Sequence, residues 1–276
     1  MGRAEVQVRP CEEVLFVGSC FANEVGRRFE EEGFPVTINP YGTMYNPVSI
    51  LHTLQRWLPL QTPREGGRLL VFLTLGTNHV YRLKATGEIV DNCEKRPASL
   101  FQEEELSVDE CTDYLQQCVT LLRRYYPEVQ VVFTVSPIRY RKYGYHESQL
   151  SKATLLLSIS RLSPPTSNHS PLNYFPAYEI VLDELRDYRF YAPDMLHPSQ
   201  QAVDYIWERL VDWCFSPEAK QYLEEWRPLK QALSHRPFNP DSAEYRALMD
   251  KTMLKVEALR EKYRTFVLPK QMKALL

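Results

Sequence analysis

The chain has 276 residues, of which 44% are hydrophobic and 25% are charged, a balance typical of globular proteins. Its 33 basic and 35 acidic side chains leave a formal net charge of −2, which does not favour a nucleic-acid groove or an anionic membrane surface. No apolar run is long enough for a membrane span, and the first ten residues lack the apolar core of a secretory signal. We expect a cytoplasmic protein without nucleic-acid or membrane partners, built as one large domain with at most a small extension.

The cysteines predict neither a disulfide framework nor a metal centre. They stand at positions 11, 20, 93, 111, 118 and 214. None forms a C-x-x-C pair, and no cysteine–histidine cluster has the spacing of a zinc site. We therefore expect reduced, mostly buried thiols and no metal ligands.

Four continuous apolar runs predict strands that are buried on both faces. They span residues 14–17, 34–38, 69–75 and 131–135, and each is followed by turn residues. A fifth, weaker strand is expected around Tyr174 and Phe175. Residues 80–90, with Ala-Thr-Gly at the centre, predict a hairpin after the third strand.

Helical patterns separate these strands. The clearest opens with a capping box formed by Ser107 and Glu110 and places apolar residues on one face. Strands that alternate with helices favour a parallel sheet covered on both sides. The predicted helices span residues 21–32, 107–124, 149–159 and 199–214.

The chain changes character after residue 215. No strand pattern follows, and residues 217–234 and 241–263 form charged amphipathic segments. We interpret them as a helical pair packed on the core. The predicted organisation is a domain at residues 1–215 and a C-terminal helical extension at 216–276.

In an open parallel sheet, ligands bind beyond the carboxyl ends of the strands. The first predicted strand is followed by Gly18, Ser19 and Cys20, where a hydroxyl or thiol at a helix start lies beside free N–H groups. Taken alone, this turn fits a serine helix cap and a packed cysteine better. Gly42 follows the second strand and Asn78 the third, and each fits an ordinary turn as well as a ligand contact.

A fourth segment carries Asp194 and His197 just ahead of the last predicted helix of the domain. The spacing D-x-x-H lets a carboxylate bind one imidazole nitrogen while the other faces a substrate. A lone histidine before a proline is more often a surface or core residue. The aspartate at this offset favours the acid–base interpretation.

Together, these four segments resemble the blocks of the SGNH (GDSL-type) hydrolases. Gly-Ser-Cys-Phe-Ala at 18–22 resembles the motif of the GSCFA family, a branch of that superfamily, and the similarity extends over most of residues 10–215. The tail, including residues 234–240, resembles that of members from the Bacteroides group of bacteria. The resemblance implies a three-layer, flavodoxin-like α/β fold, an ester-hydrolysing activity without a cofactor, and a small or carbohydrate ester as substrate.

Carried over by position, the resemblance makes His197 the general base and Asp194 its orienting partner. Asn78 and Gly42 match the residues of the oxyanion hole. The nucleophile stays open between Cys20, which aligns with the superfamily's serine, and Ser19, which supplies a hydroxyl. The predicted substrate contacts are Tyr41, His79, which stands where the superfamily often has aspartate, His146 and Lys152.

Each of these substrate contacts also has a simpler interpretation. Tyr41 and Tyr45 fit a sugar pocket or the core, and His146 and Lys152 fit a solvated surface. One departure from the family weighs against catalysis, because the usual Trp-His-Ser segment is missing between about residues 58 and 68. The sequence therefore favours an SGNH-type hydrolase and leaves a catalytically impaired binding or scaffold protein as the alternative. It does not indicate the oligomeric state.

Overall fold

The computed structural model describes residues 4–61, 68–162, 172–239 and 241–273. A five-stranded parallel sheet has the order β2-β1-β3-β7-β8. This is the flavodoxin-like order, whose switch point lies between β1 and β3. The strands are β1 (Glu13–Gly18), β2 (Val36–Ile38), β3 (Leu69–Leu75), β7 (Gln130–Val135) and β8 (Leu172–Tyr174).

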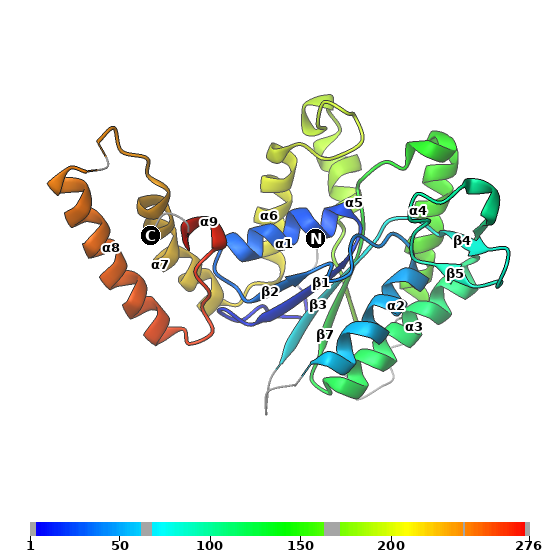
Figure 1. Ribbon diagram of the computed structural model, residues 1–276, viewed down its shortest axis with the longest axis horizontal. Helices are drawn as coiled ribbons and strands as arrows, with labels where there is room; N and C mark the ends of the chain where they lie inside the picture. The colour runs from blue at the N-terminus through cyan, green and yellow to red at the C-terminus, as the bar shows by residue number, and fades with distance from the viewer. Residues whose placement is uncertain (1–3, 62–67, 163–171, 240, 274–276) are drawn as a thin grey trace.

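Helices cover both faces of this sheet (Figure 1), so the predicted three-layer fold is confirmed. Helices α1 (Cys20–Glu31) and α6 (Gln200–Cys214) pack on one face, and α2 (Pro47–Trp57), α3 (Val108–Tyr125) and α4 (Gly144–Arg161) pack on the other. Successive side chains of β1 point to opposite faces of the sheet. Val14 and Phe16 enter the core on the α1 face, and Leu15 and Val17 enter the core on the α2 face.

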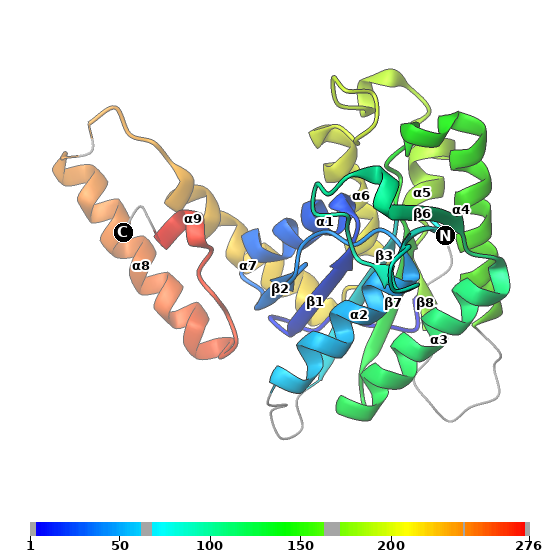
Figure 2. The ribbon, with the colours of Figure 1, turned by 45° about the vertical axis from the view of Figure 1, so that its right-hand side comes forward.

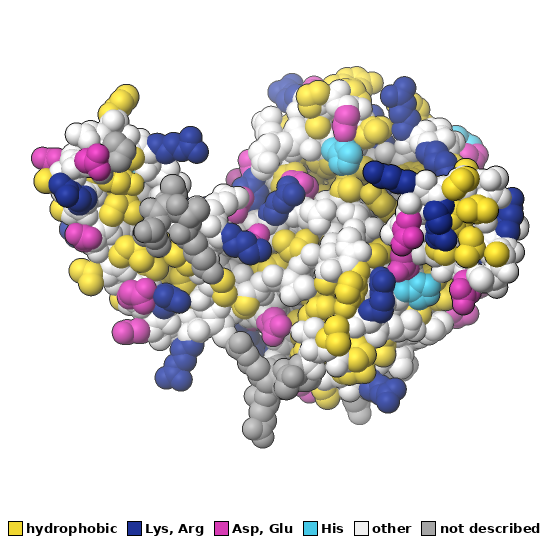
Figure 3. Space-filling model, viewed as in Figure 1, with side chains coloured by type: hydrophobic (Ala, Val, Ile, Leu, Met, Phe, Trp, Pro, Cys, Tyr) yellow, Lys and Arg dark blue, Asp and Glu magenta, His cyan; other side chains and the backbone are white. Residues whose placement is uncertain are grey.

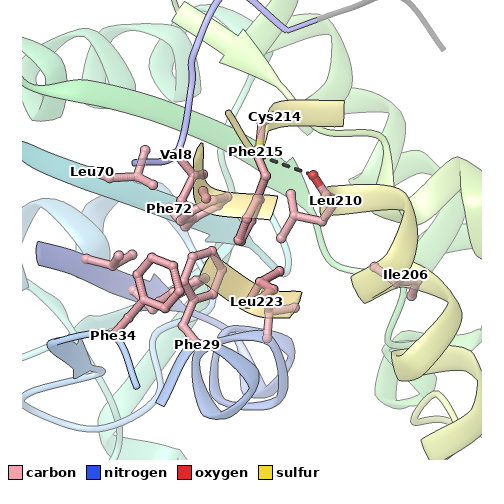
Figure 4. Packing of buried hydrophobic residues seen from close by; sticks show 14 of the residues in the cluster. Val8, Phe29, Phe34, Leu70, Phe72, Ile206, Leu210, Cys214, Phe215 and Leu223 are labelled. Carbon is pink, nitrogen blue, oxygen red and sulfur yellow. Dashed lines mark hydrogen bonds between the residues drawn. The ribbon is translucent and has the colours of Figure 1, made fainter. Parts of the chain in front are cut away.

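The core on the α1 face is rich in aromatic rings (Figure 4). The Phe29 ring lies 5.1 Å from that of Phe34 and 5.6 Å from that of Phe215. In the same cluster, the buried Cys214 thiol donates to the Leu210 carbonyl at 3.3 Å. Four of the six cysteines are buried, which agrees with the expectation of mostly buried thiols.

A second, antiparallel sheet follows β3. It has the order β5-β4-β6, with β4 (His79–Leu83), β5 (Ile89–Val90) and β6 (Phe101–Glu105). The predicted hairpin at 80–90 is confirmed, but β6 and helix α2 were not predicted. The prediction that residue 34 begins a strand is wrong, because Phe34 lies ahead of β2 with its ring buried in the core.

Short helical segments connect these elements. They are η1 (Leu58–Leu60), η2 (Ala98–Leu100), η3 (Arg141–Tyr143), α5 (Ala177–Glu179), the π-helical η4 (Ile180–Leu185) and η5 (Tyr188–Phe190). The segment expected to lack a family motif, about 58–68, contains η1, and its residues 62–67 lie outside the described residues.

The C-terminal extension comprises α7 (Pro217–Ser234), α8 (Ala243–Lys262) and α9 (Lys270–Lys273). Both ribbon views place it at one end of the molecule, away from α3 and α4 (Figure 1, Figure 2). Helix α7 joins it to the body, because the Trp226 indole donates to the Glu31 carbonyl at 3.2 Å and Tyr222 to that of Glu32. The predicted helical pair at 217–234 and 241–263 is confirmed.

The surface carries charges of both signs, and Lys/Arg and Asp/Glu side chains are interspersed on the face shown in Figure 3. Among the described residues, no helix is both long and apolar enough to cross a lipid bilayer.

Candidate active site

The turn after β1 places Ser19 and Cys20 in different environments. Ser19 is 1% exposed, and its hydroxyl accepts from the Phe21 N–H as the N-cap of α1. Cys20 is the first helical residue and is half-buried. Its position gives the thiol the positive end of the α1 dipole and neighbouring backbone N–H groups without helical acceptors.

Gly18 is required for this turn. Its φ is +151°, and a Cβ at this position would lie 2.1 Å from the Thr74 carbonyl oxygen of β3. The Gly18 N–H donates to the Asn39 side chain at 2.8 Å. The close approach therefore joins the ends of β1, β2 and β3 at the switch point of the sheet.

Tyr45 contacts the Cys20 thiol. The Tyr45 hydroxyl and the Cys20 Sγ are 3.3 Å apart. Burial, and then the contact with Cys20, raise the pKa of Tyr45 above its usual value, so the phenol stays protonated. The ring centroids of Tyr45 and Tyr140 lie 6.2 Å apart, and those of Tyr140 and Tyr143 lie 5.0 Å apart. The three rings therefore form a row, of which Tyr45 is the member that contacts the thiol.

Asp194 and His197 form the predicted pair. The Asp194 Oδ2 lies 2.5 Å from the His197 Nδ1. The other oxygen, Oδ1, accepts from the backbone N–H groups of Leu196 and His197 at 2.9 and 3.0 Å. These backbone bonds, followed by the bond to the imidazole, lower the pKa of Asp194 to about 2. Asp194 is therefore an anion at neutral pH and holds the imidazole with Nδ1 as the donor.

The loop of His197 is attached to the carboxyl end of β7. The Arg139 N–H donates to the Leu196 carbonyl at 3.2 Å, and the Arg139 guanidinium lies 3.9 Å from the ring centroid of Tyr191. Tyr191 in turn forms a β-bridge with Pro198. Arg139 therefore ties the loop to the sheet edge that also carries Cys20. The sequence alone gave no indication that Arg139 holds this loop.

Across the described residues, the His197 imidazole forms a hydrogen bond with Asp194 and none with Ser19 or Cys20. The structure thus brings together Asp194 with His197 and Cys20 with Tyr45. Direct contact between the thiol and the imidazole stays a prediction.

Each of the two predicted oxyanion residues already donates a hydrogen bond within the protein. Gly42 has a φ of +93° and open space around it, and its N–H donates to the Asn39 carbonyl at 2.9 Å. Asn78 is 3% exposed, and its Nδ2 donates to the Leu106 carbonyl at 2.7 Å. The Asn78 Oδ1 is buried without a partner among the described residues. The oxyanion role of both residues stays a prediction.

The predicted substrate contacts are scattered. Tyr41 is 37% exposed on the loop after β2, and His146 is exposed on α4. His79 is buried and stacks on Tyr143 at 3.8 Å between ring centroids. Burial lowers the pKa of His79, so its imidazole is neutral at neutral pH.

Lys152 is buried instead of solvated, so the simpler interpretation of this residue as part of the surface is wrong. Its Nζ donates to the Gly76 carbonyl at 2.6 Å. Desolvation lowers the pKa of Lys152 to about 7. The Gly76 N–H donates to the Tyr45 carbonyl at 2.8 Å. Gly76 therefore links the Lys152 amine to Tyr45, the residue that contacts Cys20.

No group of three or more His, Cys, Asp or Glu side chains in the described part of the chain has the arrangement of a metal site. The chemistry available at this edge of the sheet is that of a thiol, a carboxylate-oriented imidazole, a neutral phenol and backbone N–H groups. This set suits acyl transfer.

The fold and the site define an α/β protein of flavodoxin-like topology, with a nucleophile candidate at its switch point and a base candidate on a loop bonded to the segment after β7. The chain belongs to the GSCFA family, whose model matches residues 13–67 and 66–210. A second model, the C-terminal domain of GSCFA domain proteins, matches residues 226–275. The two parts of the first match meet at residues 66 and 67, inside the segment where the sequence lacks the expected motif.

Solved structures with a similar course of the chain include a lipolytic protein of the G-D-S-L family from Veillonella parvula, at 10% identity and a TM-score of 0.48, covering 73% of this chain and 97% of that one. A carbohydrate esterase family 3 protein from Talaromyces cellulolyticus has 12% identity and a TM-score of 0.44, covering 78% and 99%. A mutant acetyl-xylooligosaccharide esterase from Geobacillus has 11% identity and a TM-score of 0.46, covering 75% and 96%. No curated protein matches the chain.

Proposed function

We propose that the protein hydrolyses esters by acyl transfer to Cys20, with His197 as the general base and Asp194 as its orienting partner. The observation that carries this proposal is the contrast within the turn after β1. The Ser19 hydroxyl is buried as a helix cap, whereas the Cys20 thiol stands half-buried at the start of α1. This contrast favours Cys20 over Ser19 as the nucleophile.

In the proposed reaction, the His197 Nε2 takes the thiol proton and the Cys20 sulfur attacks the ester carbonyl. The resulting oxyanion accepts from the Cys20 N–H at the start of α1, with the second hydrogen of the Asn78 Nδ2 as a further donor. The Gly42 N–H joins them only if its bond to the Asn39 carbonyl opens when the substrate binds. The imidazolium then protonates the departing alcohol, which leaves a thioester on Cys20. A water molecule, deprotonated by His197, cleaves the thioester and releases the carboxylic acid.

Asp194 supports both proton transfers. Its anionic carboxylate keeps a hydrogen on Nδ1 of His197, so the Nε2 lone pair is free for the thiol. The neutral Tyr45 phenol contacts the sulfur and can donate to the thiolate as it forms.

The proposal is tested with a panel of p-nitrophenyl esters and four variants. Cys20→Ala and His197→Ala are expected to remove hydrolysis, while Ser19→Ala retains it. Cys20→Ser distinguishes a requirement for sulfur from a requirement for any nucleophile at this position. Equal rates for the wild type, Cys20→Ala and His197→Ala would contradict the proposal.

A second candidate is a binding protein that keeps this fold without catalysis. The Asn78 amide favours it, because its Nδ2 is directed to the Leu106 carbonyl and not to an open site. The same ester panel decides between the two functions.

A further inference from the structure

A cavity of about 250 Å³ is lined in part by the loop after β2, the loop whose Tyr45 contacts Cys20. The loop after β2 contributes Tyr41 and Met44, α2 contributes His52 and Arg56, and the end of the β4–β5 hairpin contributes the remaining wall. None of these groups has a role in the proposed reaction, and only Tyr41 was predicted from the sequence as a substrate contact. The cavity is large enough for one sugar ring.

A hydrogen-bonded cluster fixes the polar wall of this cavity. The Asp91 Oδ1 lies 2.8 Å from the His52 Nδ1, and its Oδ2 accepts from Arg56 at 2.8 Å. The Asp91 side chain is 16% exposed. Because both oxygens are held by side chains from α2, the carboxylate is preorganised to accept further hydrogen bonds from a ligand.

The charges of the lining balance one another. Arg56 and Arg96 contribute two positive charges, and Asp91 and Glu94 contribute two negative charges. An anion such as phosphate would meet two carboxylates here, whereas a neutral polyol meets planar groups that can each bind two adjacent hydroxyls. The balance favours an uncharged, hydroxyl-rich ligand.

One aromatic and several apolar side chains complete the lining. Arg56 lies 4.6 Å from the ring centroid of Tyr41, and the Tyr41 side chain remains 37% exposed. Ile89 and Val90, which are half-buried, provide apolar contact. Such a mixture suits a sugar ring, which has C–H faces as well as hydroxyl edges.

The loop that lines the cavity also touches the reaction centre. The Met44 N–H donates to the Gly18 carbonyl at 2.9 Å, and the next residue, Tyr45, contacts the Cys20 thiol at 3.3 Å. We infer that the cavity binds one saccharide unit, and, on the basis of the proposed function, that this unit is the alcohol part of the ester. The acyl group then lies toward Cys20.

Saturation-transfer NMR with a panel of methyl glycosides tests this site directly. The measurement uses the whole chain and its Cys20→Ala variant, so binding is read independently of hydrolysis. We expect transfer to the sugar C–H protons in both proteins. We also expect Tyr41→Ala and Asp91→Ala to weaken binding by about tenfold or more, while Phe238→Ala, which removes an exposed ring on the C-terminal extension, changes nothing.

Three results would overturn the inference. These are no glycoside binding by either protein, binding that both cavity variants leave unchanged, and displacement of the glycoside by inorganic phosphate, which would identify an anion site. The thermal melting of each variant shows whether it is folded. Glycoside binding without ester hydrolysis supports the sugar site and contradicts the hydrolase, and hydrolysis without glycoside binding does the reverse.

Discussion

The Asp194–His197 pair and the Asp91–His52 pair share a local geometry but differ in their surroundings. In each, a carboxylate oxygen lies close to an imidazole Nδ1, at 2.5 and 2.8 Å. The second oxygen of Asp194 accepts from two backbone N–H groups of its own loop, whereas that of Asp91 accepts from the Arg56 side chain.

This difference separates a candidate base from a binding group. Backbone donors neutralise no charge, so Asp194 keeps its full negative charge to stabilise an imidazolium. Arg56 already balances the charge of Asp91, which leaves the second pair better suited to hydrogen bonding than to proton transfer. The two proposed roles therefore rest on the surroundings of each histidine–carboxylate pair and not on its local geometry.

Removing the two imidazoles gives the largest expected contrast. His197→Ala should lower kcat for a p-nitrophenyl ester by about 10³-fold or more, because the thiol loses its base. His52→Ala should leave kcat unchanged and raise KM for a sugar ester. Steady-state kinetics on both variants checks this. A similar fall in kcat for both would contradict the assignment of His197 as the base and of His52 as a binding group.

Neutralising the carboxylates is expected to have a smaller effect. Asp194→Asn keeps the size of the side chain but loses the charge that orients His197, so kcat should fall by about 10²-fold. Since the pKa of Asp194 is about 2, the wild-type orientation persists down to acid pH. Asp91→Asn serves as the matched control and should retain kcat. A wild-type rate in Asp194→Asn would show that the pair is only structural.

Lys152, which is bonded to Gly76 next to the Tyr45 segment, makes the stability of the protein depend on pH. Its folded pKa of about 7 lies below the ordinary value of 10.5, so between these pH values the unfolded chain binds the extra proton. Stability from this group therefore rises with pH across that window, by roughly 1.4 kcal/mol per pH unit. Lys152→Met should lose this rise.

Urea unfolding at pH 7 and pH 9 measures the effect of Lys152. The stability difference between wild type and Lys152→Met should shift by about 2 kcal/mol between the two pH values. Lys251→Met provides the control, because it removes an exposed lysine and keeps the buried Lys152, so the rise of stability with pH should remain. A pH-independent difference for Lys152→Met would mean that the amine is hydrated in the folded protein.

Ser19 is expected to give the smallest effect. Ser19→Ala removes the N-cap hydroxyl of α1 and should lower the free energy of unfolding by about 1 kcal/mol, with ester hydrolysis retained. Denaturation and kinetics on the same sample check both parts. Loss of hydrolysis with unchanged stability would instead make Ser19 the nucleophile.

The sequence predicted the elements whose pattern is local. The run at 69–75 forms β3 with the predicted bounds, and the Ser107 capping box starts α3 as expected. Helix α2 was missed, although Asn46 caps it and Pro47 begins it, because the polar residues Ser49 and Thr53 are buried among its apolar residues and obscure the helical periodicity. Strand β6 was missed because the pairing of its residues with β4 stabilises an exposed, glutamate-rich segment.

The site was predictable in part for the same reason. The Asp194–His197 bond joins residues three positions apart and follows from spacing. The contacts of Cys20 with Tyr45, and of Arg139 with the His197 loop, join distant segments and required the fold. The burial of Lys152 likewise depends on how α4 packs against the end of β3.

Peptide mass spectrometry of the acyl-enzyme tests whether Cys20 is the nucleophile and whether His197 activates it. Wild-type protein is incubated with p-nitrophenyl acetate, quenched in acid and cleaved with trypsin, and the peptide that contains Ser19 and Cys20 is fragmented. We expect an acetyl group on the Cys20 sulfur of the wild type, and none in His197→Ala. An acetyl group on Ser19, or equal acetylation of Cys20 in the two proteins, would contradict this expectation.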